Sequence, residues 1–310
     1  MIDVASDFSG VVGVPGFDHA YGFADRAHAI ANTVGTQFAL ASGGKGFTAL
    51  AVVSLIEDGT LSLTARAREL LGDDLPLVDD RVTIEHLLAH RSGIGDYLDE
   101  ELHTDADAYV MPVPVHELAT TEDYLRVLEG HAQKFAPGER FEYCNGGYVV
   151  LALVAERASG VPFHELVHAR VCEPAGLRAT AFLRSDELPG SAALGYVGDT
   201  RTNVFHLPVR GSGDGGIYST LADVRALWGA FAAGRIVSLE WVAETTRPRS
   251  ERYGLGFWLE PDGAPRLVGS DAGVSFWSVH DGETWTVISN TTEGAWPLAR
   301  RLAEARLQGP

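Results

Sequence analysis

Short apolar runs separated by turn-forming residues occupy both ends of the chain. Residues 8–40 contain three such runs, separated by Pro-Gly and Asn-Thr stretches, and residues 252–290 contain four more. Short runs of this kind, bounded by Gly, Pro, Asn or Asp, are typical of β-strands joined by turns. The pattern therefore predicts strands at both ends of the sequence.

Longer apolar patterns predict helices in the rest of the chain. Residues 42–58 are apolar on nearly all sides and end before Gly59, which predicts a helix buried in the core. The segments "YVVLALVAERASG" and "STLADVRALWGAFAAG" predict amphipathic helices, and residues 294–307 predict a terminal helix. Thr83 is placed to cap a short helix in "TIEHLLAHRSG".

Strands at both ends with helices between them predict an α+β fold. We expect the N- and C-terminal segments to form one antiparallel sheet, flanked by helices, with a mainly helical region inserted between them. The expected sheet region comprises residues 1–60 and 250–310, and the helical region residues 61–249. Residues 95–135 are acidic and rich in His and Pro, which predicts a surface excursion, either a lid or a solvated loop. The active site is expected between the two regions.

The charge balance narrows the possible partners. The 310 residues carry a formal net charge of −18. Nucleic acids and anionic membranes bind basic surfaces, so neither is expected as a partner. The opening residues lack the basic start and apolar core of a secretory signal, and no apolar run is long enough to span a bilayer. A cytoplasmic location with two reduced thiols, Cys144 and Cys172, is the expectation, and the sequence does not indicate an oligomeric state.

Candidate chemistry is concentrated at the start of the predicted buried helix. Ser42 and Lys45 form a Ser-x-x-Lys motif, and this three-residue spacing places both side chains on one helical face. Lys45 is one of only two lysines in the chain, and burying a lone ammonium is costly. A neutral lysine can remove the proton of a serine hydroxyl, and N–H groups at the helix start can stabilise an oxyanion. The motif alone is common, so it needs support from other residues.

A second motif lies directly before an amphipathic helix. The segment "EYCNGGYVV" contains Tyr143 and Asn145 in a Tyr-x-Asn arrangement. A tyrosine beside a lysine can pass protons, and an asparagine amide can hold the lysine and bind a substrate carbonyl. Taken alone, the arrangement equally fits a capping loop. Cys144, between the two, is interpreted as a small buried filler.

Five segments in order along the chain resemble one known family. They are "FALASGGKGFTA", "IEHLLAHRSGI", "APGERFEYCNGGYVVLALVAERASG", "GSGDGGIYSTLADV" and "YGLGFWLE". The set resembles the serine β-lactamase-like (penicillin-binding-protein-like) family, which includes class C β-lactamases, D-alanyl-D-alanine carboxypeptidases, D-aminopeptidases and related esterases. The resemblance implies that Ser42 is the acylated nucleophile, that Lys45 and Tyr143 form the base system, and that Asn145 is the orienting amide. It also implies that the Ser42 backbone N–H is one oxyanion donor.

The third motif of this family departs from its usual form here. Where the family usually has Lys-Thr-Gly or His-x-Gly, the best match is "GSDAGVSF", with Ser270 in place of Lys or His. The resemblance then assigns the second oxyanion N–H to Gly273. Ser270 cannot attract a substrate carboxylate by charge, and Asp271 repels one, although Arg266 remains as a candidate nearby cation. The departure favours an esterase or amidase over an efficient β-lactamase.

Two histidine pairs allow a different interpretation. The segment "HELVH", His164 to His168, matches a zinc-binding pattern in which Glu165 is the general base. The family resemblance instead assigns it to a helix with surface histidines, and no third ligand stands out, so neither a metal nor another cofactor is expected. His86 and His90 are also four residues apart, without an acid between them, and are interpreted as packing and capping residues.

The sequence therefore predicts a serine hydrolase that acts through an acyl-enzyme on small ester, amide or peptide substrates. A β-lactamase or D-Ala-D-Ala carboxypeptidase is the alternative within enzymes. A non-catalytic binding or sensor protein is the alternative outside them. The altered third motif favours the sensor, whereas the intact set of Ser42, Lys45, Tyr143 and Asn145 argues against it.

Overall fold

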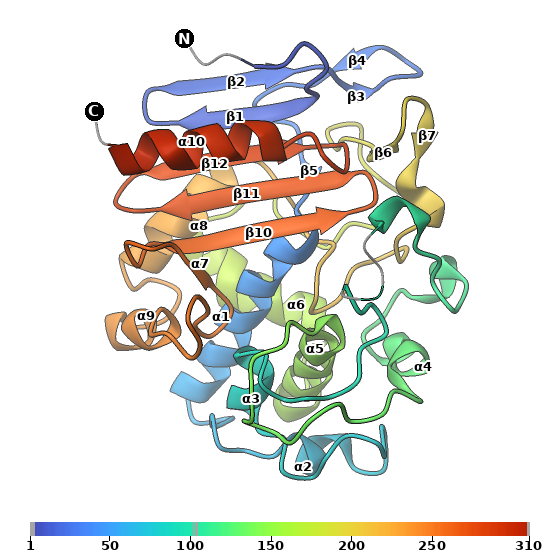
Figure 1. Cartoon of the computed structure of the whole chain (residues 1–310), viewed down its shortest axis with the longest axis vertical. Coiled ribbons are helices and arrows are strands. Elements are labelled where there is room, and N and C mark those ends of the chain that lie inside the picture. Colours follow the sequence, from blue (N-terminus) through green and yellow to red (C-terminus); the bar gives the residue numbers. More distant parts are fainter. Residues whose placement is uncertain (1–3, 101, 103–104, 309–310) are drawn as a thin grey trace.

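A six-stranded antiparallel sheet is built from both ends of the chain. The computed structural model describes residues 4–100, 102 and 105–308. The strand order is β2-β1-β12-β11-β10-β9, so an N-terminal hairpin extends a C-terminal meander (Figure 1). The strands are β1 (Gly10–Val14), β2 (Phe17–Tyr21), β9 (Trp258–Leu259), β10 (Pro265–Asp271), β11 (Val274–His280) and β12 (Thr284–Ser289). The predicted α+β fold with one shared antiparallel sheet is confirmed.

Helices cover both faces of this sheet. Successive strand residues point to opposite faces, so Phe276 faces one layer and Trp277 the other. Trp277 packs with Leu298 of α10 (Trp296–Gln308), which lies across the outer face in Figure 1. Phe276 belongs to the main core, which also contains α1 (Gly44–Glu57) and α8 (Leu221–Ala232).

The segment between β2 and β9 contains the other helices, joined by long loops. Its remaining helices are α2 (Ala67–Leu71), α3 (Ile84–Leu88), α4 (Leu125–Leu128), α5 (Asn145–Ser159), α6 (Phe163–Val167), α7 (Glu173–Ala175) and α9 (Leu239–Thr245). Short two-stranded pairs join β3 (Phe23–Asp25) to β4 (Ile30–Ala31), β5 (Phe38–Ala39) to β8 (Tyr218–Ser219), and β6 (Tyr196–Val197) to β7 (Arg201–Thr202). Among the described residues, no helix combines the length and the apolar character that crossing a membrane requires.

The central helix α1 connects the two expected regions. Every residue of α1 from Gly44 to Leu55 is buried, as its uniformly apolar pattern predicted. It contacts α5 from the middle of the chain, and both helices belong to one hydrophobic core. Because that core crosses the expected boundary near residue 60, the division into two regions stays a prediction.

The described part of segment 95–135 packs onto the body of the protein. Its side chains Tyr97, Leu118 and Tyr124 are buried in the main core, whereas Leu102 and Val110 are exposed, so the segment is anchored to the body of the protein and also reaches solvent. Residues 101, 103 and 104 lie outside the described residues, and the prediction that the segment acts as a lid stays a prediction.

Candidate active site

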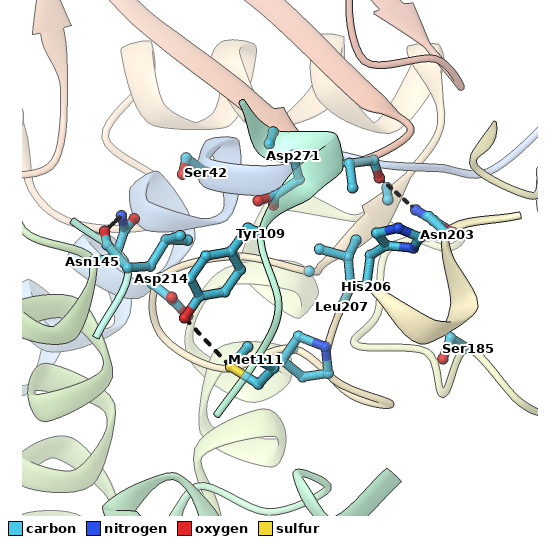
Figure 2. Close-up of a pocket in the computed structure, with 18 of the residues that line it drawn as sticks. Ser42, Tyr109, Met111, Asn145, Ser185, Asn203, His206, Leu207, Asp214 and Asp271 are labelled. Atoms are coloured by element: carbon cyan, nitrogen blue, oxygen red, sulfur yellow. Dashed lines mark hydrogen bonds between the residues drawn. The ribbon is translucent and has the colours of Figure 1, made fainter. Parts of the chain in front are cut away.

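Ser42 stands at a crowded turn between the sheet and α1. The turn η1 (Ala41–Gly43) leads into the helix, and Ala41 has a φ of 45°, which is unusual for a residue other than glycine. Strand β10 passes directly against this turn: a Cβ at Gly269 would lie 2.1 Å from the Leu40 carbonyl oxygen and 2.9 Å from the Ser42 backbone nitrogen. Strained backbone of this kind often accompanies a functional site. Ser42 lines a cavity of about 370 Å³ (Figure 2).

Lys45 is held between three acceptors at the edge of this cavity. Its Nζ lies 2.9 Å from Ser42 Oγ, 2.7 Å from Asn145 Oδ1 and 2.7 Å from the Asp214 carbonyl oxygen, and the residue is only 2% exposed. Asn145 Oδ1 and the Asp214 carbonyl oxygen can only accept hydrogen bonds, whereas the Ser42 hydroxyl can donate or accept. A neutral lysine would therefore use its two N–H groups on the carbonyl oxygens and turn its lone pair toward Ser42. This geometry suits removal of the Ser42 proton.

Tyr143 lies beside the Lys45 amine. The Lys45 Nζ is 4.9 Å from the centre of the Tyr143 ring, which stacks on Trp258 and packs against His90. Burial raises the pKa of Tyr143 well above its usual value, and the charge of Glu100 adds to this, while a hydrogen bond with Ser42 opposes it. Tyr143 is therefore a neutral hydroxyl near pH 7, which suits it to relay a proton rather than to act as a phenolate.

Asn145 is the first residue of α5, and both ends of its amide are engaged. Its Oδ1 accepts from Lys45, while its Nδ2 donates to the Leu98 carbonyl oxygen at 2.9 Å and to Glu100 at 3.2 Å. Its backbone N–H donates to the Asp96 carboxylate, which also accepts from Gly146. This carboxylate complements the positive end of α5. Burial raises the pKa of Asp96 to about 6 despite these hydrogen bonds.

The prediction for Gly273 is wrong. Its backbone N–H donates to Thr292 Oγ1 at 2.8 Å, and it occupies the hairpin turn with a φ of 72°. The glycine that lies against Ser42 is Gly269, four residues earlier. Ser270, the next residue of β10, lines the cavity. Arg266 is not among the described lining residues, and it pairs with Glu260 at 2.7 Å instead.

Three carboxylates line the cavity together with neutral polar side chains and His206. Asp214 and Asp271 lie on walls of the same space as Ser42 (Figure 2), and Glu100 also lines it. Tyr97 donates a hydrogen bond to Asp214, whose pKa is raised by burial and lowered in part by Lys45. Burial and the Asp214 charge raise the pKa of Asp271 to about 7. None of the described residues that line the cavity is Lys or Arg.

Much of the remaining wall is apolar and comes largely from segment 95–135 and the stretch after β7, where Asn203 and His206 also line the cavity. Aromatic and aliphatic side chains from these segments form a surface that suits an apolar substrate group. They include Tyr97, Leu98, Tyr109, Met111, Tyr124 and Leu207. Tyr109 is anchored by donating to the Tyr97 carbonyl oxygen at 2.8 Å.

The two histidines of "HELVH" do not share a site. His164 points inward, where its Nε2 lies 2.8 Å from the Gly211 carbonyl oxygen, so the expectation that it is a surface residue is wrong. Burial and the charge of Arg210 lower the pKa of His164 to about 4. His168 is exposed and lies 3.5 Å from Glu173. Within the described part of the chain, no group of three or more His, Cys, Asp or Glu is arranged to hold a metal ion.

His86 and His90 have the packing and capping positions that the sequence indicated. His86 and Thr83 form a reciprocal capping box at the start of α3. His90 is buried, and its Nδ1 accepts from the backbone N–H of Cys144 at 3.1 Å. Through this bond and its contact with the Tyr143 ring, His90 supports the loop that carries the second motif. Burial raises the pKa of the Cys144 thiol well above its usual range, so this cysteine is not a thiolate nucleophile.

The sequence resembles a known family of proteins and several of its members. Residues 13–308 match the model of the family described as Beta-lactamase. Penicillin-binding protein 4* of Bacillus subtilis (strain 168) is 32% identical over 197 residues, covering 62% of this chain and 41% of that protein. A D-aminopeptidase of Brucella anthropi is 29% identical over 275 residues, covering 84% of this chain and 49% of that protein. The chain thus spans about half the length of the curated relatives it matches.

Solved structures match over nearly the whole chain. A penicillin-binding protein from Bacillus halodurans superposes with a TM-score of 0.90 at 34% identity, covering 97% of both chains. A D-amino acid amidase from Ochrobactrum anthropi SV3, complexed with D-phenylalanine, has a TM-score of 0.78 at 21% identity, covering 98% of this chain and 95% of that one. The second likeness concerns the fold alone.

Proposed function

The chain belongs to the beta-lactamase family, and from this premise we propose that it is a serine hydrolase acting on small ester or amide substrates through an acyl-enzyme. The observation that carries the proposal is the 2.9 Å contact between Lys45 Nζ and Ser42 Oγ at the cavity wall. A nucleophile and base within hydrogen-bond reach, with the base oriented by further groups, is the arrangement that nucleophilic catalysis requires.

In the proposed mechanism, Ser42 Oγ attacks the substrate carbonyl while its proton passes to Lys45. Tyr143 then relays that proton to the leaving group, and a water molecule later hydrolyses the acyl-enzyme. The Ser42 backbone N–H and a backbone N–H of β10 bind the oxyanion. We assign the β10 donor to Ser270, because Ser270 lines the cavity and adjoins Gly269, which lies against the Ser42 nitrogen.

A fluorophosphonate probe tests this proposal directly. We expect the intact mass of the native protein to increase by one phosphonyl group, and peptide mapping to place that group on Ser42. Heat-denatured protein is the control and should not react, because activation of Ser42 depends on the folded arrangement. A native protein that remains unmodified, or that is modified only at another residue, would contradict the proposal.

Penicillin-type substrates form the second candidate class, because relatives of this chain are named penicillin-binding proteins. Against them stands the cavity lining, which includes Asp271 and has no Lys or Arg among its described residues. A substrate carboxylate here would lack a charge-assisted hydrogen bond worth about 1.5–3 kcal/mol. The loss corresponds to roughly one to two orders of magnitude in kcat/KM.

We therefore expect a neutral p-nitrophenyl ester to be a better substrate than a chromogenic cephalosporin, after each rate is divided by that of uncatalysed hydrolysis. Ser270→His should narrow the difference by supplying a cation at the cavity wall, which Ser270 lines. The measurement is kcat/KM for both substrates in the wild type and the variant. If the wild type prefers the cephalosporin after this correction, the β-lactamase alternative replaces the esterase or amidase assignment.

The cellular location and the partners of the protein are also proposals. We propose a cytoplasmic protein whose partner is its small-molecule or peptide substrate. The oligomeric state stays open; a structural neighbour from Pyrococcus abyssi is described as octameric, and that statement concerns the neighbour alone.

A further inference from the structure

Asp96 is a buried carboxylate that the proposed mechanism does not use. Only 8% of the residue is exposed, and it lies in the loop after α3. Its Oδ2 accepts from the Asn145 backbone N–H at 2.6 Å. Its Oδ1 accepts from the Gly146 N–H at 2.8 Å and from the Leu98 N–H at 3.2 Å. Both oxygens of one short side chain are therefore bonded to the first turn of α5.

These bonds connect Asp96 to Lys45 through Asn145. The Leu98 carbonyl oxygen, two residues after Asp96, accepts from Asn145 Nδ2 at 2.9 Å. The loop after α3 thus holds both the backbone and the side-chain nitrogen of Asn145, whose Oδ1 then accepts from Lys45 Nζ at 2.7 Å. Asp96 is not among the described residues that line the cavity, so its route to the reacting atoms is through Asn145.

The same loop supports the other carbonyl group that binds Lys45. Tyr97, the residue after Asp96, donates to the Asp214 carboxylate. The main-chain carbonyl oxygen of Asp214 accepts from Lys45 Nζ at 2.7 Å. Two of the three acceptors of the Lys45 amine therefore depend on consecutive residues of one loop. A shift of this loop would misplace the base, and a misplacement of about 1 Å can cost about 100-fold in rate.

The charge of Asp96 is part of this arrangement. An ionised carboxylate only accepts hydrogen bonds, so both of its oxygens can bind backbone N–H groups at once. When one oxygen carries a proton, that oxygen becomes a donor, and its hydrogen needs another acceptor in a buried place. Protonation of Asp96 therefore weakens its hold on either Asn145 or Gly146.

The groups around Asp96 leave its ionisation close to neutral pH. Burial raises the pKa of Asp96 to about 6, against the opposing effects of its three backbone bonds and of the Lys45 charge. The other titratable side chains that interact with it are neutral near pH 7, because burial raises the pKa of each: Tyr97, Tyr109 and Cys144. Asp96 thus changes its charge within a pH range in which the enzyme can be assayed.

We propose that Asp96 is a positioning residue whose ionised carboxylate orients Asn145, and through it Lys45, for the deprotonation of Ser42. The proposal rests on the proposed serine hydrolase function and adds a residue that controls the same site. Because the ionised form is the active one, activity is full above the pKa of Asp96 and is lost as the pH falls through it. The fold is not lost with it: a carboxyl whose pKa is raised by folding stabilises the folded state as the pH falls.

Asp96→Asn tests the positioning role with a neutral p-nitrophenyl ester. We expect kcat to fall about 10- to 100-fold while KM stays within about threefold, since Asp96 does not line the cavity. Asp58→Asn is the matched control, because Asp58 also accepts a backbone N–H, from Thr60 at 3.0 Å, but is exposed beyond the far end of α1. It should keep wild-type kcat within about threefold. A folded Asp96→Asn enzyme with wild-type kcat overturns the proposal.

A double-mutant cycle separates positioning through Asn145 from a general structural role. In an Asn145→Ala background, Asp96→Asn should lower kcat further by no more than about threefold, because the residue through which Asp96 acts has already been lost. If the second change lowers kcat by the same factor as it does in the wild type, Asp96 does not act through Asn145 and the proposal is wrong.

The pH dependence of the wild type gives a measurement that does not depend on the folding of a variant. With a pKa of about 6 for Asp96, we expect kcat to fall by at least about 10-fold from pH 7 to pH 5, without a lower unfolding temperature. Asp96→Asn removes this contribution, so its kcat should change about 10-fold less over the same interval. A wild-type kcat that is equal at pH 7 and pH 5 overturns the proposal. A wild type that neither hydrolyses the ester at pH 7 nor reacts with a fluorophosphonate would instead count against the serine hydrolase function.

Discussion

Ser42→Ala is expected to lower kcat/KM for a neutral p-nitrophenyl ester by about 10⁴-fold or more, because the variant has no atom that can form the acyl-enzyme. The change removes one hydroxyl from a half-buried residue, and Lys45 keeps its other two acceptors. We therefore expect the fold to be retained. The measurement is steady-state kinetics together with thermal unfolding.

Ser62→Ala is the matched control for this prediction. Ser62 is exposed, its hydroxyl lies 3.4 Å from Thr64 Oγ1 in the turn after α1, and it is not among the described residues that line the cavity. The control should retain wild-type kcat/KM within about threefold, as surface substitutions usually do. If Ser42→Ala kept a tenth or more of the wild-type activity while folded, another nucleophile would have to carry the reaction.

The local part of the site could be predicted from the sequence. The Ser42–Lys45 contact follows from helical spacing, and the need to compensate a buried lysine indicated that partners existed. Asn145 was a candidate from the Tyr-x-Asn arrangement and from the family resemblance, and the structure places it against Lys45. In the same way, short apolar runs bounded by turn-forming residues predicted strands near both termini, and their placement at both ends predicted the shared antiparallel sheet.

The long-range part of the site could not be predicted in this way. The third acceptor of Lys45 is the main-chain carbonyl of Asp214, 169 residues away, and a carbonyl oxygen has no sequence signal. Asp96 and Asp271 reach the site from two further segments, so their proximity depends on tertiary packing. Sequence matching also could not decide between Gly269 and Gly273. Gly269 is needed because the backbone of Leu40 and Ser42 approaches it closely, and Gly273 is needed for a positive φ in a turn. Both requirements select glycine, so the residue type does not distinguish the two positions.

The second lysine of the chain makes the role of Lys45 directly testable. Lys45→Arg keeps a positive charge in the site, but a guanidinium stays protonated at working pH and cannot accept the Ser42 proton. General acid–base catalysis typically contributes 10²- to 10⁴-fold, so we expect kcat for the neutral ester to fall by about 10³-fold. Lys134→Arg is the control, because Lys134 forms ion pairs with Asp99 and Glu142 that arginine can also form.

The two variants separate catalysis by Lys45 from a purely structural role. If Lys45 served only to satisfy Asn145 Oδ1 and the Asp214 carbonyl oxygen, the donors of arginine would restore much of that function and kcat would fall little. If Lys45 is the base, the kcat of Lys45→Arg falls steeply although Ser42 still faces the cavity. Lys134→Arg keeps its activity within about threefold of the wild type. Thermal unfolding of both variants identifies any loss that comes from misfolding in the tightly packed site. A folded Lys45→Arg enzyme with near wild-type kcat would assign the deprotonation of Ser42 to another group, and Tyr143, which contacts both Ser42 and Lys45, would be the candidate.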